Sequence, residues 1–218
     1  MGLAVMKVLI MTNGEYGELE WYQRHKEGYD QIICVDGGAG WARKLGILPN
    51  WVVGDMDSLC GDDLKFMEQQ GVQFCRYPCQ KDLTDTQISL QLAEKLGAEE
   101  ITIWGGTGSR LDHTLHNLYS AANLVKKGKT VRFDSPVLSI YLVKDILKLS
   151  GEIGKTVSVL AIGDGACGVS LEGFQYPLDN AEIDSMWQYG ISNVIVSSPQ
   201  LISVASGILA VFYYRELP

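Results

Sequence analysis

The sequence predicts an α/β protein: a doubly wound, mostly parallel sheet in an N-terminal domain, followed by a C-terminal all-β sandwich domain. Up to about Phe133, short apolar runs alternate with helix-like segments, which is typical of a parallel sheet with helices on both faces. Beyond this point the helical period is lost, and short β-type runs follow one another between Gly, Asp, Asn and Pro. We therefore expect two domains, residues 1–135 and 136–218.

Six short apolar runs are the expected strands of the first domain. Most of their residues are β-branched, aromatic or otherwise apolar, and turn-forming residues follow them. Because helices separate them, we expect the strands to be parallel, with their carboxyl ends at one edge of the sheet. The runs cover residues 7–12, 31–36, 51–55, 72–78, 100–106 and 130–134.

Four helices are expected between these strands, each with a glycine at or near its end. The clearest covers residues 83–98, because apolar residues recur every four positions and Gly97 follows them. Thr84, with Gln87 three residues later, has the capping-box pattern of a helix start. The other helices are expected over residues 38–47, 62–71 and 111–128.

The second domain is expected to consist of strands alone. Its β-type runs cover residues 138–143, 155–162, 168–173, 193–197, 201–207 and 208–216.

The charge balance limits the possible ligands. The 218 residues carry a formal net charge of −8, which argues against a general nucleic-acid surface. A phosphate site in such a chain needs local cations, either Mg²⁺ or a few placed Arg and Lys side chains. Lys7 interrupts the only apolar N-terminal stretch, and no run is long enough to cross a bilayer. Because the five cysteines form no CxxC pair, we expect free thiols, no zinc site and a cytoplasmic protein.

Two carboxylates one residue apart follow the third strand, in WVVGDMDSL. Like charges this close repel each other, so Asp55 and Asp57 each require water or a cation. One interpretation is a polar turn in which Asp57 or Ser58 caps the next helix. The other interpretation is a metal site.

The neighbouring loops favour the metal site. Ligands of a doubly wound sheet bind outside the carboxyl ends of its strands, where we expect all of these loops to meet. Five of the carboxylates, gathered there without cations, would cost stability, whereas Mg²⁺ binds to a few carboxylates together with substrate phosphates. These five are Asp36, Asp55, Asp57, Asp85 and Asp112. We expect Asp55 and Asp57 to bind Mg²⁺, with Lys81 and Arg110 on an anionic substrate. The loops carry Asp36 with Gly37 and Gly38, Asp55 with Asp57, Lys81 to Asp85, and Gly105 to Asp112.

The segment GGTGSRLDH is the most specific of these loops. Its glycines lie between a strand and a helix, where backbone N–H groups hold phosphate, and Thr107 and Gly108 belong to this turn. Arg110 adds a fork of donors for phosphate oxygens. Asp112 is expected to orient Arg110 or to bind a metal, although helix N-terminal charge explains it equally well. Of the two histidines that follow, we expect His113 beside the site and His116 to be an ordinary helix residue.

The complete set of motifs resembles the thiamine pyrophosphokinases of the bacterial type. The motifs are VDGG, GILPNWVVGDMDS, KDLTDTQ, GGTGSRLDHTLHN, LEGFQYPL and GISN, in this order along nearly the whole chain. Asn50 and Met56 depart from the usual Asp and Phe of the family. The resemblance implies an α/β domain that binds ATP and Mg²⁺, a β-sandwich domain that contributes to the thiamine site, and a homodimer. It also implies that pyrophosphate passes from ATP to the thiamine hydroxyl, with AMP as the other product.

The resemblance also assigns roles by position. Asp57, Asp85 and Arg110 are the expected catalytic residues, and Asp55, Asp57 and Asp85 the expected Mg²⁺ ligands. Ser192 and Asn193 match a thiamine clamp, although the residues alone would favour a turn between strands. Tyr176 is a weaker candidate for stacking on the cationic thiazolium, and Trp187 has no motif match. The expected nucleotide-binding residues are Asp36, Gly37, Lys81, Thr107, Gly108, Arg110, Asp112 and His113.

Three other functions are compatible with parts of the pattern. An NAD(P)-dependent oxidoreductase would use WGGTGSR and Asp134, but its fingerprint is incomplete. An Mg²⁺-dependent phosphatase would use Asp55 as a nucleophile and release phosphate. A non-catalytic nucleotide- or thiamine-binding protein would bind ATP and turn over nothing.

Overall fold

The computed structural model describes residues 5–56, 61–76 and 82–216. The chain divides into two compact units, the first with Met1–Ala121 and Phe133–Pro136, the second with Ala122–Arg132 and Val137–Pro218. The division falls inside α5 (Leu111–Lys126) and β6 (Thr130–Asp134). Across the described ranges, none of the helices combines the length and the apolar character that a membrane span requires.

The N-terminal unit contains a parallel sheet in the order β4-β3-β2-β1-β5. Strand β1, which lies between β2 and β5, is buried on both faces, since Val8, Leu9, Ile10 and Met11 are all fully buried. This burial explains why the strand is a continuous apolar run with no polar alternation. The five strands are β1 (Lys7–Met11), β2 (Gln31–Val35), β3 (Trp51–Gly54), β4 (Gln73–Arg76) and β5 (Glu100–Trp104).

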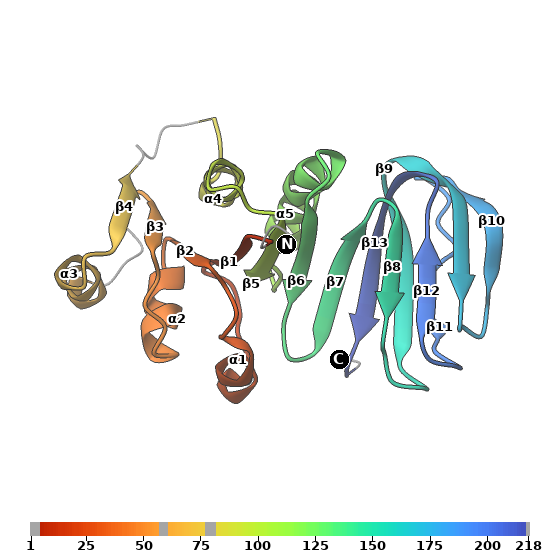
Figure 1. The fold of residues 1–218 in the computed structure, drawn as a ribbon, viewed down its shortest axis with the longest axis horizontal. Helices are drawn as coiled ribbons and strands as arrows, with labels where there is room; N and C mark the ends of the chain where they lie inside the picture. The colour runs from red at the N-terminus through yellow and green to blue at the C-terminus, as the bar shows by residue number, and fades with distance from the viewer. Residues whose placement is uncertain (1–4, 57–60, 77–81, 217–218) are drawn as a thin grey trace. The chain divides into compact units, whose positions relative to one another are not determined.

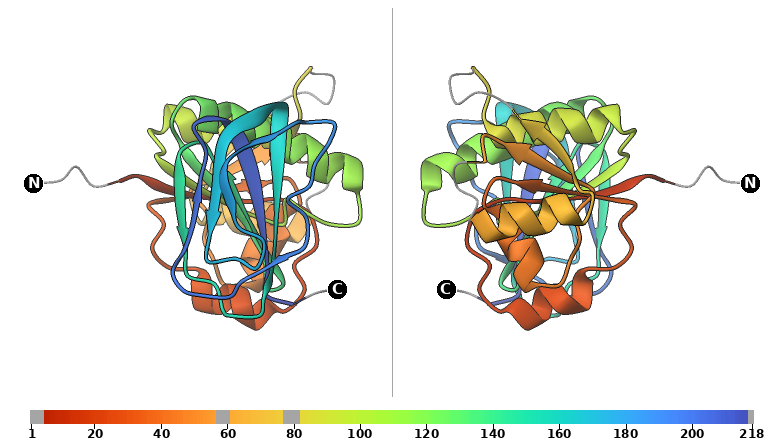
Figure 2. Two further views of the ribbon diagram at one scale, coloured as in Figure 1. Left: turned by 90° about the vertical axis from the view of Figure 1, so that its right-hand side faces the viewer. Right: turned by 90° about the vertical axis from the view of Figure 1, so that its left-hand side faces the viewer.

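The strand order reverses at β1. From β1 the chain adds β2, β3 and β4 on one side and then returns to place β5 on the other side. Right-handed crossovers therefore place α1 and α2 on one face of the sheet and α4 and α5 on the opposite face, as Figure 1 shows. The right-hand view of Figure 2 shows this layering from the β4 edge. The helices are α1 (Leu19–His25), α2 (Gly38–Lys44), α3 (Gly61–Gln69), α4 (Asp85–Lys95) and α5.

Helix α4 begins at the capping box that the sequence predicts. Thr84 Oγ1 accepts the Gln87 N–H at 3.3 Å, and the Gln87 side chain accepts the Thr84 N–H at 3.1 Å. The first turn of α4 is thereby fixed by local contacts that do not depend on the rest of the fold.

The C-terminal unit is an antiparallel sandwich whose two sheets share the long strand β9 (Thr156–Glu172). The first half of β9 pairs with β13 and β11, and the second half pairs with β12 and β10 and, next to the bulge, with the start of β13. Side chains from both halves and from both sets of neighbours form one apolar core, as expected for two packed sheets. The remaining strands are β7 (Leu138–Val143), β8 (Ile146–Leu149), β10 (Leu178–Ile183), β11 (Asn193–Val194), β12 (Gln200–Ser203) and β13 (Ser206–Tyr214).

The predicted α/β and sandwich architecture is confirmed, and the differences are local. The sequence predicts separate strands over residues 155–162 and 168–173, whereas the chain continues between them within β9, with a bulge between Ile162 and Ala166. Gly163 and Gly165 have φ of 87° and 113°, so the bend uses backbone conformations that favour glycine. Sequence analysis also missed α1, β8 and β10, each short and with a weak periodic pattern.

Gln200 provides a stability test of the sandwich. Its side chain is fully buried, and its Oε1 accepts the Gly151 N–H at 2.8 Å while its Nε2 donates to the Ser197 carbonyl. Gln200→Leu should lower the free energy of unfolding by about 1–3 kcal/mol, because buried backbone groups lose their partner. Guanidinium denaturation measures this loss. Gln175→Leu, at an exposed glutamine of the same unit, is the matched control and should change stability by less than about 0.5 kcal/mol.

Candidate active site

The main cleft of the N-terminal unit opens at the carboxyl ends of β1, β2 and β5, where the strand order reverses. Doubly wound sheets bind their ligands at this position, because the loops on either side of the reversal diverge and leave a crevice. The cleft has a volume of about 920 Å³. It is lined by residues 12–15, 35–36, 83–86, 105–110, 112–114, 116 and 117.

Helix α5 holds the glycine-rich loop that follows β5. The buried Asn117 donates from Nδ2 to the Gly106 carbonyl at 2.9 Å. One turn earlier, Thr114 Oγ1 accepts the Gly108 N–H at 3.2 Å. Two side chains of one helix thus fix the loop at two points, although the Gly108 N–H is already engaged within the protein.

The loop that follows β1 also contacts the glycine-rich loop. Glu15 Oε1 accepts the Ser109 N–H at 3.3 Å, and hydrogen bonds from the Ser109 hydroxyl and N–H lower the pKa of Glu15. Glu15 is therefore ionised at neutral pH, and its carboxylate binds the kind of backbone donor that would otherwise bind an anion.

Tyr16 supports the base of the cleft from below. Its buried hydroxyl donates to the Thr12 carbonyl at 3.1 Å and lies 3.4 Å from the Trp104 carbonyl, at the ends of β1 and β5. The Tyr16 ring stacks on Trp41 with centroids 4.8 Å apart. A Cβ on Gly105 would lie 2.6 Å from this ring and 2.9 Å from the Thr12 oxygen. Only glycine therefore allows the loop to pass this close to the aromatic cluster.

Arg110 and Asp112 form a two-point ion pair at the start of α5. Arg110 Nε donates to Asp112 Oδ1 at 2.9 Å, and a terminal guanidinium nitrogen donates to Oδ2 at 2.6 Å. These hydrogen bonds hold the pKa of Asp112 well below its usual range. Both side chains are about two-thirds exposed, so the pair orients the guanidinium more than it stabilises the fold.

Asp36 and Asp85 both line the cleft, as expected. Asp36 lies directly after β2, with a φ of 48°, and its N–H donates to the Val53 carbonyl at 2.9 Å. Asp85 is the first residue of α4 and is half-buried. Thr107, Gly108, Arg110, Asp112 and His113 line the same cleft.

The other predicted residues near this edge have different positions. Of the described candidates, Gly37 and Asp55 do not line the cleft: Gly37 precedes α2, and Asp55 follows β3, two strands away from β1. Asp57 and Lys81 lie outside the described residues. Within residues 5–56, 61–76 and 82–216, no three His, Cys, Asp or Glu side chains are grouped closely enough to hold a metal ion.

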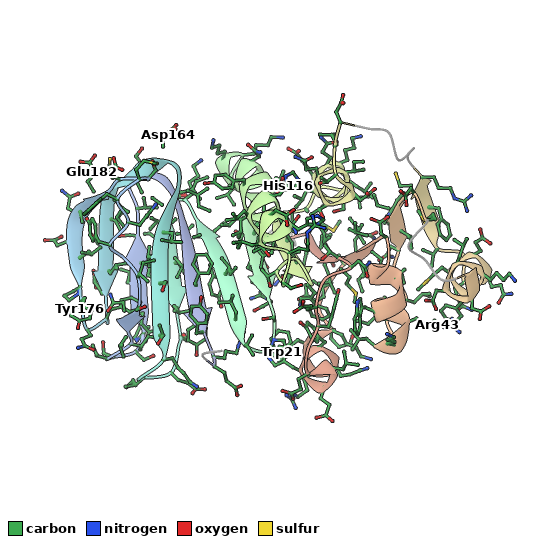
Figure 3. The ribbon with its side chains drawn as sticks, turned by 180° about the vertical axis from the view of Figure 1, so that it is seen from behind. Trp21, Arg43, His116, Asp164, Tyr176 and Glu182 are labelled. Carbon is green, nitrogen blue, oxygen red and sulfur yellow. The ribbon has the colours of Figure 1, made fainter. Side chains whose placement is uncertain are left out.

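The predicted thiamine clamp belongs to the C-terminal unit. Asn193 is buried, and its amide bonds both backbone polar groups of Tyr176: Oδ1 accepts the N–H at 3.0 Å and Nδ2 donates to the carbonyl at 2.7 Å. The Tyr176 side chain is 63% exposed and lies at the border of this unit in Figure 3. Ser192 is exposed, with a φ of 58°.

Trp187 is also presented to solvent. It is 79% exposed and lies in a turn where Asp184 Oδ1 accepts the N–H groups of Met186 and Trp187, at 2.7 and 3.2 Å. These two hydrogen bonds from backbone N–H groups to the Asp184 side chain define the turn that presents the Trp187 indole.

Sequence analysis missed several residues of the cleft. Asn13, Gly14 and Glu15 line the cleft but have no predicted role, although β1 is the strand at which the order reverses. His116 lines the cleft and is bonded to Thr84, so it is not the ordinary helix residue that was predicted. The sequence does not give the order of the strands in the sheet. The loop after β1 becomes a candidate site only once β1 is known to be the strand at which this order reverses.

Two family models match the chain, over residues 22–133 and 145–209. Their descriptions are thiamin pyrophosphokinase, catalytic domain, and thiamin pyrophosphokinase, vitamin B1 binding domain. The chain belongs to the thiamin pyrophosphokinase family. A curated relative, the thiamine pyrophosphokinase of Bacillus subtilis (strain 168), is 30% identical over 181 residues, which cover 81% of this chain and 84% of the relative.

Solved structures of the thiamin pyrophosphokinase family have the same fold. The crystal structure of the Bacillus subtilis enzyme superimposes with a TM-score of 0.86 at 24% identity, covering 97% of this chain and all of that one. The enzyme from Geobacillus thermodenitrificans gives a TM-score of 0.80 at 25% identity, covering 97% and 98% of the two chains.

Gly105→Ala tests the packing beneath the glycine-rich loop. The new methyl group would clash with Tyr16 and a backbone oxygen, and Gly105 has a φ of 68°. The substitution should therefore lower the free energy of unfolding by about 1–3 kcal/mol and the melting temperature by several degrees. Gly108→Ala is the matched control, since its Cβ would meet nothing closer than 3.6 Å. Equal melting temperatures for the two variants would contradict this account.

Proposed function

We propose that this chain transfers a pyrophosphoryl group from ATP to the hydroxyl of thiamine, giving thiamine diphosphate and AMP. The observation that carries the proposal is the match of both family models, one of which covers most of the residues that line the cleft. The thiamine oxygen attacks the β-phosphorus, the bond to the α-phosphate oxygen breaks, and the hydroxyl proton leaves to a base. Such transfers depend chiefly on positioning and on neutralisation of charge.

The nucleotide is assigned to the cleft of the N-terminal unit. The Gly108 and Ser109 N–H groups are bonded to Thr114 and Glu15, so the proposed phosphate donors are other backbone N–H groups of the glycine-rich loop and of the start of α5. Asp112 occupies two of the five guanidinium N–H donors of Arg110, which leaves the others for phosphate oxygens. The proposed nucleotide-binding residues are Asp36, Gly37, Lys81, Thr107, Gly108, Arg110, Asp112 and His113.

The donor set at this edge fits Mg²⁺. Asp36 and Asp85 provide hard carboxylate oxygens in the cleft, and Mg²⁺ is commonly held by one or two carboxylates together with substrate phosphates. We propose Asp55, Asp57 and Asp85 as the residues that would hold it. Of these, Asp85 lines the cleft, Asp55 follows β3, and Asp57 lies outside the described residues. When bound, the ion would supply charge neutralisation to the phosphates. Asp57, Asp85 and Arg110 are the proposed catalytic residues.

Thiamine is assigned to the C-terminal unit, with Ser192, Asn193 and Tyr176 as its proposed contacts. Because both ends of the Asn193 amide are bonded to the Tyr176 backbone, Asn193 would act by fixing where Tyr176 presents its ring. An exposed aromatic ring suits a cationic thiazolium, which is attracted to the face of the π-system. Trp187 is a second exposed aromatic candidate.

The same proposal includes the organisation of the protein. Residues 1–135 form the domain that binds ATP and Mg²⁺, and residues 136–218 form the thiamine-binding domain. We propose that the protein acts as a homodimer in the cytoplasm. The exposed apolar side chains of α5 support the dimer, because Leu111, Leu115 and Tyr119 lie at four-residue spacing on one helix face. The comparisons do not support the oxidoreductase or the phosphatase.

One incubation with ATP, Mg²⁺ and thiamine tests the activity, with AMP as the measured product. AMP formation that depends on thiamine is expected, whereas ADP or free phosphate alone would contradict the proposal.

Asp57→Asn should lower kcat by about 10²–10³-fold, because a group that helps to neutralise charge in the transition state is lost. Asp30→Asn is the matched control, since this carboxylate accepts the Lys7 N–H at the opposite edge of the sheet. Near-normal turnover of Asp57→Asn at saturating Mg²⁺ would contradict the metal assignment.

Asn193→Ala tests the thiamine side. Removing the amide leaves the Tyr176 N–H and carbonyl without their partner, so the KM for thiamine should rise several-fold more than the KM for ATP. Steady-state kinetics with each substrate varied in turn measure the two constants. The melting temperature is measured in parallel, and an equal rise of both KM values in a stable variant would count against the assignment.

A further inference from the structure

His116 connects two helices at the cleft. Its Nε2 lies 3.0 Å from Thr84 Oγ1, so a side chain of α5 reaches the residue immediately before α4. In Figure 3, His116 lies where α5 faces α4. The same nitrogen lies 3.4 Å from the hydroxyl of the buried Ser120, one turn further along α5. The imidazole is half-buried and lines the cleft.

The Thr84 hydroxyl has two roles at once. Its oxygen accepts the Gln87 N–H of the capping box, and the same hydroxyl forms a second hydrogen bond with His116 Nε2. A hydroxyl can donate to an unprotonated ring nitrogen or accept from a protonated one, so the link forms with either state of Nε2. The start of α4 is therefore fixed locally by the capping box and tied to α5 by the histidine.

Helix α5 is hydrogen-bonded both to the glycine-rich loop and to the start of α4. Asn117 and Thr114 fix the glycine-rich loop to this helix, and His116 fixes the start of α4 to it. His116 and Asn117 are adjacent in the sequence, so the two attachments share one turn of the helix. Asp85 follows Thr84 directly, and consecutive Cα atoms are about 3.8 Å apart, so a constraint on Thr84 limits where the Asp85 carboxylate can lie.

We propose that His116 is a positioning residue for Asp85. Through Thr84, it sets the distance between the Asp85 carboxylate and the glycine-rich loop, and thus the alignment of metal-binding and phosphate-binding groups. The catalytic consequence rests on the proposed function, whereas the mechanical link rests on the hydrogen bonds alone. Because the capping box remains when His116 is removed, α4 still folds, but its first turn, whose Gln87 and Ile88 N–H groups bond to Thr84, opens more often and its placement relaxes.

Three variants at this position separate the link from simple loss of a side chain. His116→Ala removes the bond, and His116→Asn retains an amide that is too short to reach Thr84. His116→Gln places a polar atom close to the position of Nε2 and should restore the bond. His25→Ala, at a histidine of α1 that bonds the Trp21 carbonyl, is the control and should change neither measurement below.

Hydrogen exchange of the α4 amides, followed by mass spectrometry, measures the link independently of activity. In His116→Ala and His116→Asn, exchange in the first turn of α4 should be at least several-fold faster, and in His116→Gln it should approach the wild-type rate. Unchanged exchange in His116→Ala would overturn the proposal, as would a glutamine variant no better than the asparagine variant.

Steady-state kinetics measure the catalytic consequence. Because displacements of about 1 Å at a reacting group can cost up to about 10²-fold in rate, kcat should fall about 10-fold in His116→Ala while the KM for thiamine stays unchanged. A lower kcat with unchanged exchange would mean that His116 acts on the substrate directly, which overturns the positioning role. If the wild-type protein forms no AMP, the proposed function fails, and the exchange data alone decide whether the link exists.

Discussion

The arrangement of the cleft depends on the junction between the ends of β1 and β5. The Trp104 carbonyl accepts the Thr12 N–H at 2.9 Å and the Thr12 hydroxyl at 3.2 Å, and the Tyr16 hydroxyl lies 3.4 Å away. Two donors of Thr12 thus converge on one oxygen at the point where the strand order reverses, and the Tyr16 hydroxyl, which donates to the Thr12 carbonyl, lies beside it. The loops after β1 and β5 both leave from this point, so the hydrogen bonds of Thr12 and Tyr16 fix where the two loops begin relative to each other.

Much of this architecture can be predicted from local sequence patterns. Alternating apolar and helix-like segments define the parallel unit, and Thr84 with Gln87 marks the start of α4, because these signals depend only on neighbouring residues. The order of strands in the sheet is a non-local property, and no short pattern encodes it. For this reason Glu15 was missed and Asp55 was expected closer to the cleft than it lies.

The sandwich illustrates the same limit in another form. Gly163 and Gly165 lie between two apolar runs, as glycines of a turn do, so local patterns favour a turn at this place. The pairing of β9 with β13 on both sides of the bulge decides instead for one continuous strand that passes between two sheets. His116 was underestimated for a related reason: its partner Thr84 is 32 positions away, and helix periodicity alone carries no information about contacts with another helix.

The charges at the cleft argue for a bound cation. Glu15, Asp36 and Asp85 line it, and the nearby positive charge of Arg110 is already balanced by Asp112. A phosphate oxygen about 4 Å from a carboxylate is repelled by about 4 kcal/mol at an effective dielectric constant of about 20. Positive charge that accompanies a polyanionic nucleotide would offset this repulsion, and the proposed divalent ion, shared by carboxylates and phosphates, would do so directly. The acidity of the site, which first argues against a phosphate ligand, is thus compatible with the proposed complex of metal and nucleotide.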